Sequence, residues 1–165
     1  MDTTEILIKI RKIVRSINLE SKKIEKEYGV SIPQVLCLHF LHDSPNYQST
    51  QGEIRRFLNL NSSTTSGIID RLERKGYIAR LPKSGDKRAV NIALTSAGDK
   101  LLGNVPSLLH EQLSDKLKKL DNRKLEEVES SLDTLVNLLE IQEVKASPMI
   151  TMDDMLEDSA SEKNG

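Results

Sequence analysis

The chain has 165 residues, 37% of them hydrophobic and 30% charged, with two Phe, three Tyr and no Trp, so we expect long solvent-facing helices around a core of Leu, Ile and Val. It has no run of about 18 apolar residues and no basic start followed by an apolar stretch, so we expect neither a membrane span nor a secretory signal. The net charge of −1 hides a basic middle, because residues 50–100 hold ten Lys or Arg against five Asp or Glu; this +5 leaves −6 for the remainder and favours a polyanion-binding segment on acidic scaffolding.

The first predicted element is a long helix over residues 3–27. One face carries isoleucines at spacings of four, three, four and seven, namely Ile6, Ile10, Ile13, Ile17 and Ile24. Gly29 follows at a position where a left-handed helix cap costs little. A second helix is expected over residues 31–42 with Pro33 in its first turn, and residues 43–49 (DSPNYQS) have the composition of a turn.

The middle of the chain predicts two helices joined by a tight turn. A capping box formed by Thr50 and Glu53 predicts a short helix to about residue 58. Residues 59–61 (NLN) form the turn, and Asn61 can cap the next helix, over residues 62–75, which stops before a glycine. Two short strands are expected next, over residues 77–82 and 89–94, with residues 83–88 (KSGDKR) as the polar hairpin between them.

The last part of the chain predicts two further helices. Thr95 is expected to cap a long helix, in which Gly103 and Pro106 are the candidate positions for a kink. Asp121 is expected to cap the final helix. That helix carries an apolar seam at spacings of three and four residues, made of Leu125, Val128, Leu132, Leu135 and Leu139.

A short helix, a tight turn and a second helix, followed at once by a hairpin, form the pattern of a winged helix-turn-helix protein. The fold class is therefore mainly α with a small β-wing. The isoleucine stripe and the leucine seam present more apolar surface than one small domain can cover, so we expect a homodimer. The expected parts are an N-terminal dimerisation helix (1–30), a winged helix-turn-helix domain (31–98), C-terminal dimerisation helices (99–145) and an acidic tail (146–165) that we expect to be disordered.

The predicted recognition helix opens with five hydroxyl residues, Ser62, Ser63, Thr64, Thr65 and Ser66, followed by Gly67. Such residues are poor helix formers, but small hydroxyls let a helix approach the major groove closely and contact phosphates and base edges. A purely structural capping segment is an equally good explanation of this stretch alone. Cations at the outer or C-terminal side of the helix (Arg71, Arg74 and Lys75) are further candidates for DNA contact, although Arg71 could instead pair with its acidic neighbours Asp70 or Glu73.

The hairpin tip carries a cluster of cations, Lys83, Lys87 and Arg88, around Asp86. Tips that merely connect strands favour Asn-Gly and lack such a cluster. A cationic tip can reach phosphates or the minor groove, where arginine is favoured in narrow A·T tracts. Asp86 could orient the Arg88 guanidinium through a charge-assisted hydrogen bond.

Three segments together resemble the multiple antibiotic resistance regulator (MarR) family. They are TSGIIDRLERKGYI (65–78), similar to the family's recognition helix and its exit, DKR (86–88), similar to its wing motif, and ALTSAG (93–98), similar to the Leu-Thr-x-x-Gly that closes the wing. The flanking helices extend the resemblance over about residues 3–143, and the tail lies outside it. The resemblance implies a homodimer with intertwined terminal helices, palindromic DNA, recognition helices in consecutive major grooves and wings in the minor grooves.

Other candidate sites carry weaker signals. Cys37 lies in the apolar segment LCLHFL (36–41), so we expect a buried core thiol that fits a reducing, cytoplasmic setting. The three histidines, His39, His42 and His110, lack a ligand motif around them, so we expect no metal and no cofactor. No phosphate loop, H-E-x-x-H, C-x-x-C or nucleophile elbow occurs, so we do not expect an enzyme.

The predicted function is that of a sequence-specific DNA-binding regulator, acting as a repressor on palindromic operator DNA. Its expected partners are double-stranded DNA, a second copy of the chain and, from the resemblance, a small-molecule effector that releases it. The alternative is a protein-interaction module, in which the winged helix is a scaffold and the long end helices, together with the acidic tail, recruit another protein. The basic middle and the hydroxyl-rich helix start favour DNA.

Overall fold

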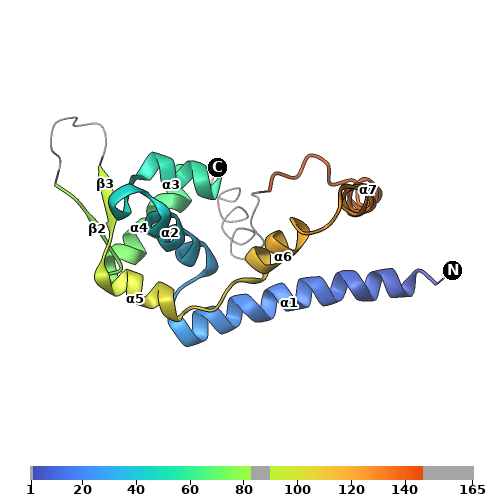
Figure 1. The fold of residues 1–165 in the computed structure, drawn as a ribbon, viewed down its shortest axis with the longest axis horizontal. Helices are drawn as coiled ribbons and strands as arrows, with labels where there is room; N and C mark the ends of the chain where they lie inside the picture. Colours follow the sequence, from blue (N-terminus) through green and yellow to red (C-terminus); the bar gives the residue numbers. More distant parts are fainter. Residues whose placement is uncertain (1, 83–89, 147–165) are drawn as a thin grey trace. The chain divides into compact units, whose positions relative to one another are not determined.

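The computed structural model of the protein describes residues 2–82 and 90–146, which fall into two compact units divided after Pro106 (Figure 1). The first unit holds five α-helices and a small sheet, and the second holds two helices. None of the helices in the described residues is long and apolar enough to cross a membrane.

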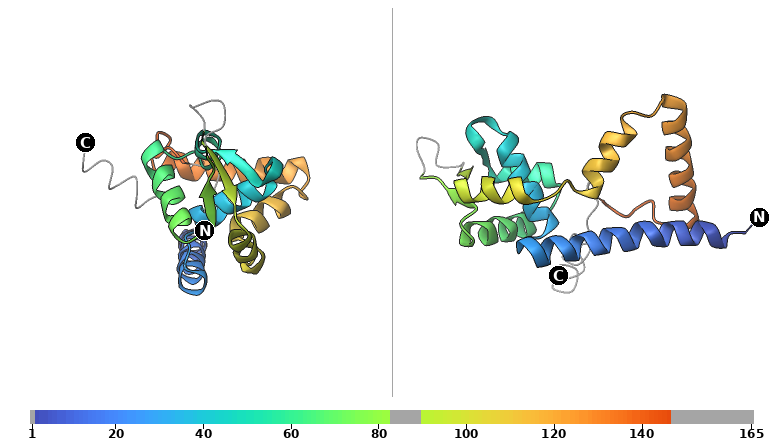
Figure 2. Two further views of the ribbon diagram at one scale, coloured as in Figure 1. Left: turned by 90° about the vertical axis from the view of Figure 1, so that its left-hand side faces the viewer. Right: turned by 60° about the horizontal axis from the view of Figure 1, so that its bottom comes forward.

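Helix α1 (Thr4–Tyr28) is one unbroken helix, as predicted, and Figure 2 shows its full length. It ends at Gly29, which has a φ of 69° and donates its N–H to the Glu25 carbonyl, so the left-handed cap is confirmed. The predicted stripe is covered at one end only. Ile24 is buried, whereas Ile6 and Ile13 are 47% and 60% exposed within the chain.

Helix α2 (Ile32–Asp43) forms the centre of the first unit. Ser31 caps it, because its hydroxyl accepts from the Gln34 N–H while the Gln34 side chain accepts from the Ser31 N–H. The helix is buried over most of its length and packs against α3, α4, α5 and β3. Burial raises the pKa of the Cys37 thiol to about 12, which confirms Cys37 as a core residue.

The segment predicted as a plain turn contains a strand. Residues Pro45–Tyr47 form a short 3-10 turn, and β1 (Gln48–Thr50) then pairs antiparallel with β3 (Asn91–Leu94), with Ser49 opposite Ile92. The other edge of β3 pairs with β2 (Ile78–Arg80), so the predicted two-stranded hairpin is a three-stranded sheet in the order β1-β3-β2, seen side by side in Figure 2. The sequence of β1 (QST) is polar and does not predict a strand. The strand forms because its backbone pairs with the free edge of β3.

Helices α3 (Gln51–Leu58) and α4 (Ser62–Arg74) form the predicted helix-turn-helix. The turn between them passes through Asn59 in the left-handed region at a φ of 52°, and Asn61 caps α4. The inner faces of the two helices are buried, with side chains from Ile54, Leu58, Ile68, Ile69 and Leu72. Helix-turn-helix and sheet together confirm the winged helix-turn-helix fold.

The long helix predicted after Thr95 is two helices. Thr95 caps α5 (Ser96–Asn104) as predicted, but the backbone leaves the helical region at Val105. Val105 precedes Pro106, and the proline ring disfavours a helical conformation in the residue before it. The chain therefore breaks at this point, where the sequence predicted one helix with a kink.

A close backbone contact explains the glycine of the Leu-Thr-x-x-Gly segment. The Thr95 hydroxyl donates to the Gly76 carbonyl at 2.7 Å, and the Thr95 N–H donates to the Tyr77 carbonyl at 3.1 Å. These bonds bring the start of α5 onto the exit of α4, so a Cβ at position 98 would lie 2.2 Å from the Tyr77 carbonyl oxygen. Only glycine fits at position 98 without a shift of the backbone.

The second unit consists of α6 (Leu109–Leu117) and α7 (Asn122–Leu138). Asp121 caps α7 as predicted, accepting from the Lys124 N–H at 2.8 Å. None of the residues of α7, all of which the structure describes, is buried. The predicted seam is half-buried at best, and Leu132 is 54% exposed.

Candidate nucleic-acid interface

The N-terminal end of α4 presents hydroxyls on the protein surface. Ser62 and Ser63 are exposed, and Thr64 and Ser66 are half-buried. The cap comes from outside the hydroxyl run, because the Asn61 side chain accepts from the Thr64 N–H at 2.7 Å. The hydroxyls of Ser63 and Thr64 are therefore not needed to cap this helix, which weakens the purely structural explanation.

Thr65 does not belong to this surface, contrary to the sequence prediction. Its side chain is completely buried, and its hydroxyl donates to the Asn61 carbonyl at 2.9 Å. Thr65 lies three, four and seven residues before Ile68, Ile69 and Leu72, so it continues their inner stripe. This spacing is a signal in the sequence that could have identified Thr65 as a core residue, although its hydroxyl resembles those of its neighbours.

Arg71 extends the hydroxyl surface by one turn. A Cβ placed on Gly67 would lie 3.4 Å from both terminal nitrogens of the Arg71 guanidinium, so this group lies over Gly67. Long side chains on a helix point back towards its N-terminus, which explains the placement. The cation thus stands close to the turn that carries Ser63, Thr64 and Ser66.

Two acids of α4, Asp70 and Glu73, bind Arg80 of β2. Arg80 is not among the residues predicted for DNA contact. The Asp70 carboxylate accepts from the Arg80 guanidinium at 2.7 Å, and the Glu73 carboxylate accepts from it at 2.8 Å. Glu73 also accepts from the Arg80 backbone N–H at 3.1 Å. The hydrogen bond to Asp70, followed by that to Glu73, raises the pKa of Arg80 against the effect of burial.

The cations at the C-terminal end of α4 lie away from the hydroxyls. Lys75 donates from Nζ to the Gly29 carbonyl, where α1 ends, and Arg74 is exposed. Twelve residues of helix separate Ser63 from Lys75, or about 18 Å at 1.5 Å per residue. Lys75 therefore connects α4 to α1, and the predicted set divides into two groups at opposite ends of the helix.

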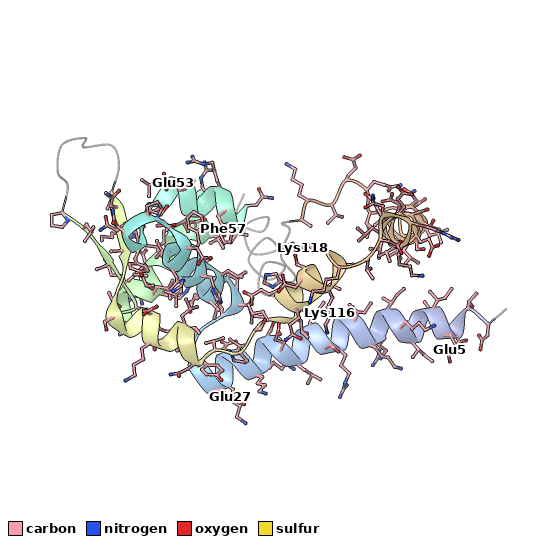
Figure 3. The ribbon with its side chains drawn as sticks, viewed as in Figure 1. Glu5, Glu27, Glu53, Phe57, Lys116 and Lys118 are labelled. Atoms are coloured by element: carbon pink, nitrogen blue, oxygen red, sulfur yellow. The ribbon has the colours of Figure 1, made fainter. Side chains whose placement is uncertain are left out.

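Glu53, labelled in Figure 3, accepts hydrogen bonds at the start of α3. The Glu53 carboxylate accepts from the Ser49 hydroxyl and, at 3.5 Å, from the Thr50 N–H, while the Thr50 hydroxyl accepts from the Glu53 N–H at 3.2 Å. The Ser49 bond, followed by the Thr50 bond, lowers the pKa of Glu53. The capping box was predicted, whereas Ser49 was not, since it reaches Glu53 from strand β1.

The cationic hairpin tip, with Lys83, Asp86, Lys87 and Arg88, lies outside the described residues, so its role stays a prediction. The same holds for the tail beyond Ala146. In the described ranges, no group of three or more His, Cys, Asp or Glu side chains could hold a metal ion.

Comparison with known proteins points to one family. The MarR family model matches residues 30–90, which include α2, α3, α4 and the predicted wing. The chain is 27% identical over 123 residues to the uncharacterized HTH-type transcriptional regulator YsmB of Bacillus subtilis, covering 74% of this chain and 83% of that protein. It is also 41% identical to the HTH-type transcriptional regulator PecS of Dickeya dadantii over 59 residues, 36% of each chain.

Solved structures share the fold. The MepR–DNA complex of S. aureus superimposes with a TM-score of 0.60 at 23% identity, covering 83% of this chain and 98% of MepR. At this level of identity the likeness shows the fold alone.

Proposed function

Because this chain carries a MarR-family domain over residues 30–90, we propose that it is a DNA-binding transcriptional regulator that acts as a homodimeric repressor. Helix α4 enters the major groove by its N-terminal end, and the wing over residues 83–88 reaches the minor groove. The observation that carries the proposal is the hydroxyl surface at the start of α4, exposed at Ser63 and half-buried at Thr64 and Ser66. Asn61 caps the helix independently of these hydroxyls, and the Arg71 guanidinium extends the surface.

A second copy of the chain is the proposed partner of the terminal helices. The isoleucine stripe of α1 is exposed at Ile6 and Ile13 and half-buried at Ile10 and Ile17, and the leucine seam of α7 is equally open. Apolar surface of this kind is stabilised by burial against a partner. The chain then divides by role into dimerisation helices at residues 1–30 and 99–145 around a reading domain at 31–98.

The dimer decides the kind of DNA. A two-fold symmetric protein places two recognition helices on half-sites about one helical turn apart, so the operator is a palindrome. Release by a small-molecule effector is a further part of the proposal that rests on the family alone.

The test begins by selecting duplexes from a random pool with the full-length protein. Fluorescence anisotropy then compares the selected duplex with a scrambled one at several salt concentrations. Thr64→Ala is expected to cost about 1–3 kcal/mol against the selected duplex through a lost base contact and to leave scrambled DNA unaffected. Lys87→Ala is expected to weaken binding to both duplexes alike and to flatten the salt slope by about two units, because the dimer loses one phosphate contact, worth about 0.9 unit, in each subunit.

Thr134→Ala is the matched control for Thr64. Thr134 is exposed on α7, and its hydroxyl donates only within its own helix, to the Ser130 carbonyl at 3.0 Å. This control is expected to bind both duplexes like the wild type. Failure of the wild-type protein to enrich any duplex would overturn the proposal and favour the protein-interaction module.

A further inference from the structure

One side chain joins the recognition helix to the sheet. Arg80 of β2 makes three hydrogen bonds to two acids that lie one turn apart on α4, with donor–acceptor distances of 2.7, 2.8 and 3.1 Å. Glu73 binds both the guanidinium and the backbone N–H of Arg80, so side chain and strand are held together. We call Asp70, Glu73 and Arg80 the helix–strand clamp.

The clamp is too exposed to serve mainly as a source of stability. The side chains of Arg80, Asp70 and Glu73 are 30%, 48% and 40% exposed, and solvent screens ion pairs of this kind. Its geometry is nevertheless specific, because the planar guanidinium meets two carboxylates and fixes their direction. The buried contacts of α4 through Ile68, Ile69 and Leu72 hold the helix in the fold without it.

The clamp also controls the charge that α4 presents. Asp70 lies three residues after Gly67 and one before Arg71, beside the hydroxyl surface. If α4 lies in a major groove, unpaired carboxylates at Asp70 and Glu73 would repel the phosphates of the DNA. Bound to Arg80, both are turned towards β2 and partly neutralised.

We propose that Arg80 is a positioning residue for DNA recognition, which fixes the direction of α4 against β2 by binding Asp70 and Glu73. This inference rests on the proposed function and deepens it. Arg80 acts through the two acids, so it needs no phosphate contact of its own. Directly after the strand that Arg80 ends, the Leu81 N–H donates to the Asn91 carbonyl at 2.8 Å, next to the segment predicted to form the wing.

The decisive variant keeps Arg80 and removes its partners. Asp70→Asn with Glu73→Gln adds two positive units to the net charge, so general electrostatics predicts tighter binding to every duplex. Our proposal predicts tighter binding to scrambled DNA but a ratio of selected to scrambled affinity about tenfold lower, the size of a lost base contact. A phosphate-binding role for Arg80 predicts an unchanged or higher ratio, since the arginine would be released for DNA.

Two further variants complete the series. Arg80→Lys keeps the positive charge but loses the planar guanidinium that binds both carboxylates. It is expected to lower the ratio of selected to scrambled affinity less than Arg80→Gln does. Arg74→Gln is the control, because it removes a cation from the same helix outside the clamp and should weaken both duplexes without changing their ratio. Circular dichroism melting confirms that each protein is folded at the assay temperature.

The outcomes separate the inference from the function. If the wild type selects DNA and the double variant keeps the full ratio, the positioning role is wrong and the proposed function stands. If the wild type selects no duplex, the proposed function itself fails. Should the double variant not fold, Asp70→Asn alone, which keeps both Glu73 bonds, is measured in the same way, with about a threefold drop expected and an unchanged ratio counting against the proposal.

Discussion

The reading domain and the terminal helices use the same aliphatic residues in opposite ways. In the reading domain (31–98), the leucine and isoleucine side chains of α2, α3 and α4 are buried, as are Ile78 of β2 and Ile92 of β3. In α1 and α7 the same residue types stand in equally regular stripes and, apart from Ile24 near the end of α1, stay half or fully exposed. An apolar stripe therefore indicates that a helix packs against another surface. The tertiary structure decides whether that surface belongs to the same chain.

The polar contacts of the two regions also differ, because those of the reading domain join different elements and those of α7 stay within one helix. In the reading domain, charged and capping side chains connect different elements, as in the bonds of Arg80 to α4 and of Thr95 to Gly76. In α7 they connect neighbours within one helix, such as Lys124 and Glu127 at 2.9 Å. Exposed pairs of that kind contribute little stability, so we expect the reading domain to be stable by itself and the terminal helices to depend on association.

The largest effect is expected from a cavity in the reading domain. Leu38 is completely buried in α2, so Leu38→Ala should cost about 2–5 kcal/mol of unfolding free energy. Because the core is closed within one chain, urea unfolding at two protein concentrations should report the same cost. A cost that changes with concentration would show that α2 shares in the subunit interface.

A smaller loss is expected at the junction of sheet and α5. Gly98→Ala places a Cβ 2.2 Å from the Tyr77 carbonyl oxygen, and overpacking against backbone costs about 1–3 kcal/mol. Gly103→Ala in the same helix is the matched control, since a Cβ there meets nothing within 4 Å. It should stabilise by about 0.5–1 kcal/mol, so thermal melts that shift the two variants in one direction would contradict the close-contact explanation.

Substitutions in the terminal helices should weaken association of the dimer and leave the stability of the reading domain unchanged. Ile13→Ala removes apolar surface that we assign to the dimer and should weaken it by about 1–2 kcal/mol. Light scattering during gel filtration over a dilution series measures the midpoint of dissociation, starting from about twice the 18.5 kDa chain mass. Arg11→Ala, an exposed change off the stripe, should leave the midpoint in place, and an equal shift for both variants would remove Ile13 from the interface.

The smallest effect is a pH dependence at the start of α3. Hydrogen bonds from Ser49 and Thr50 lower the pKa of Glu53 below its ordinary 4.5, so their contribution is present above that pH and is lost as the pH falls through the folded value. Glu53→Gln should therefore be less stable than the wild type at neutral pH and converge with it in acid. If the free energy of unfolding depends on pH in the same way for both proteins, the charge of the Glu53 carboxylate contributes no stability beyond what the amide of the variant provides.

The sequence by itself determined the local elements of this protein. The helix starts are marked by the predicted caps Thr50, Asn61, Thr95 and Asp121, and Gly29 marks an end, because a cap is made within a few residues of the chain. Three short motifs in their order predicted the resemblance to the family whose model matches residues 30–90, and the hydroxyl run predicted the surface of α4 that we propose for DNA contact.

The tertiary structure decided whatever depends on a distant partner. Strand β1 exists because β3 offers an edge more than forty residues further along the chain, and Thr65 is buried because it faces the core beside Ile68 and Ile69. The contacts of Arg80 with Asp70 and Glu73, on which its proposed role rests, are visible only in the fold, since nothing in its own neighbourhood distinguishes it from the other cations of the basic middle. Periodicity and capping are short-range properties of the chain, whereas strand pairing, burial of one hydroxyl among five and the choice of an ion-pair partner are settled by packing.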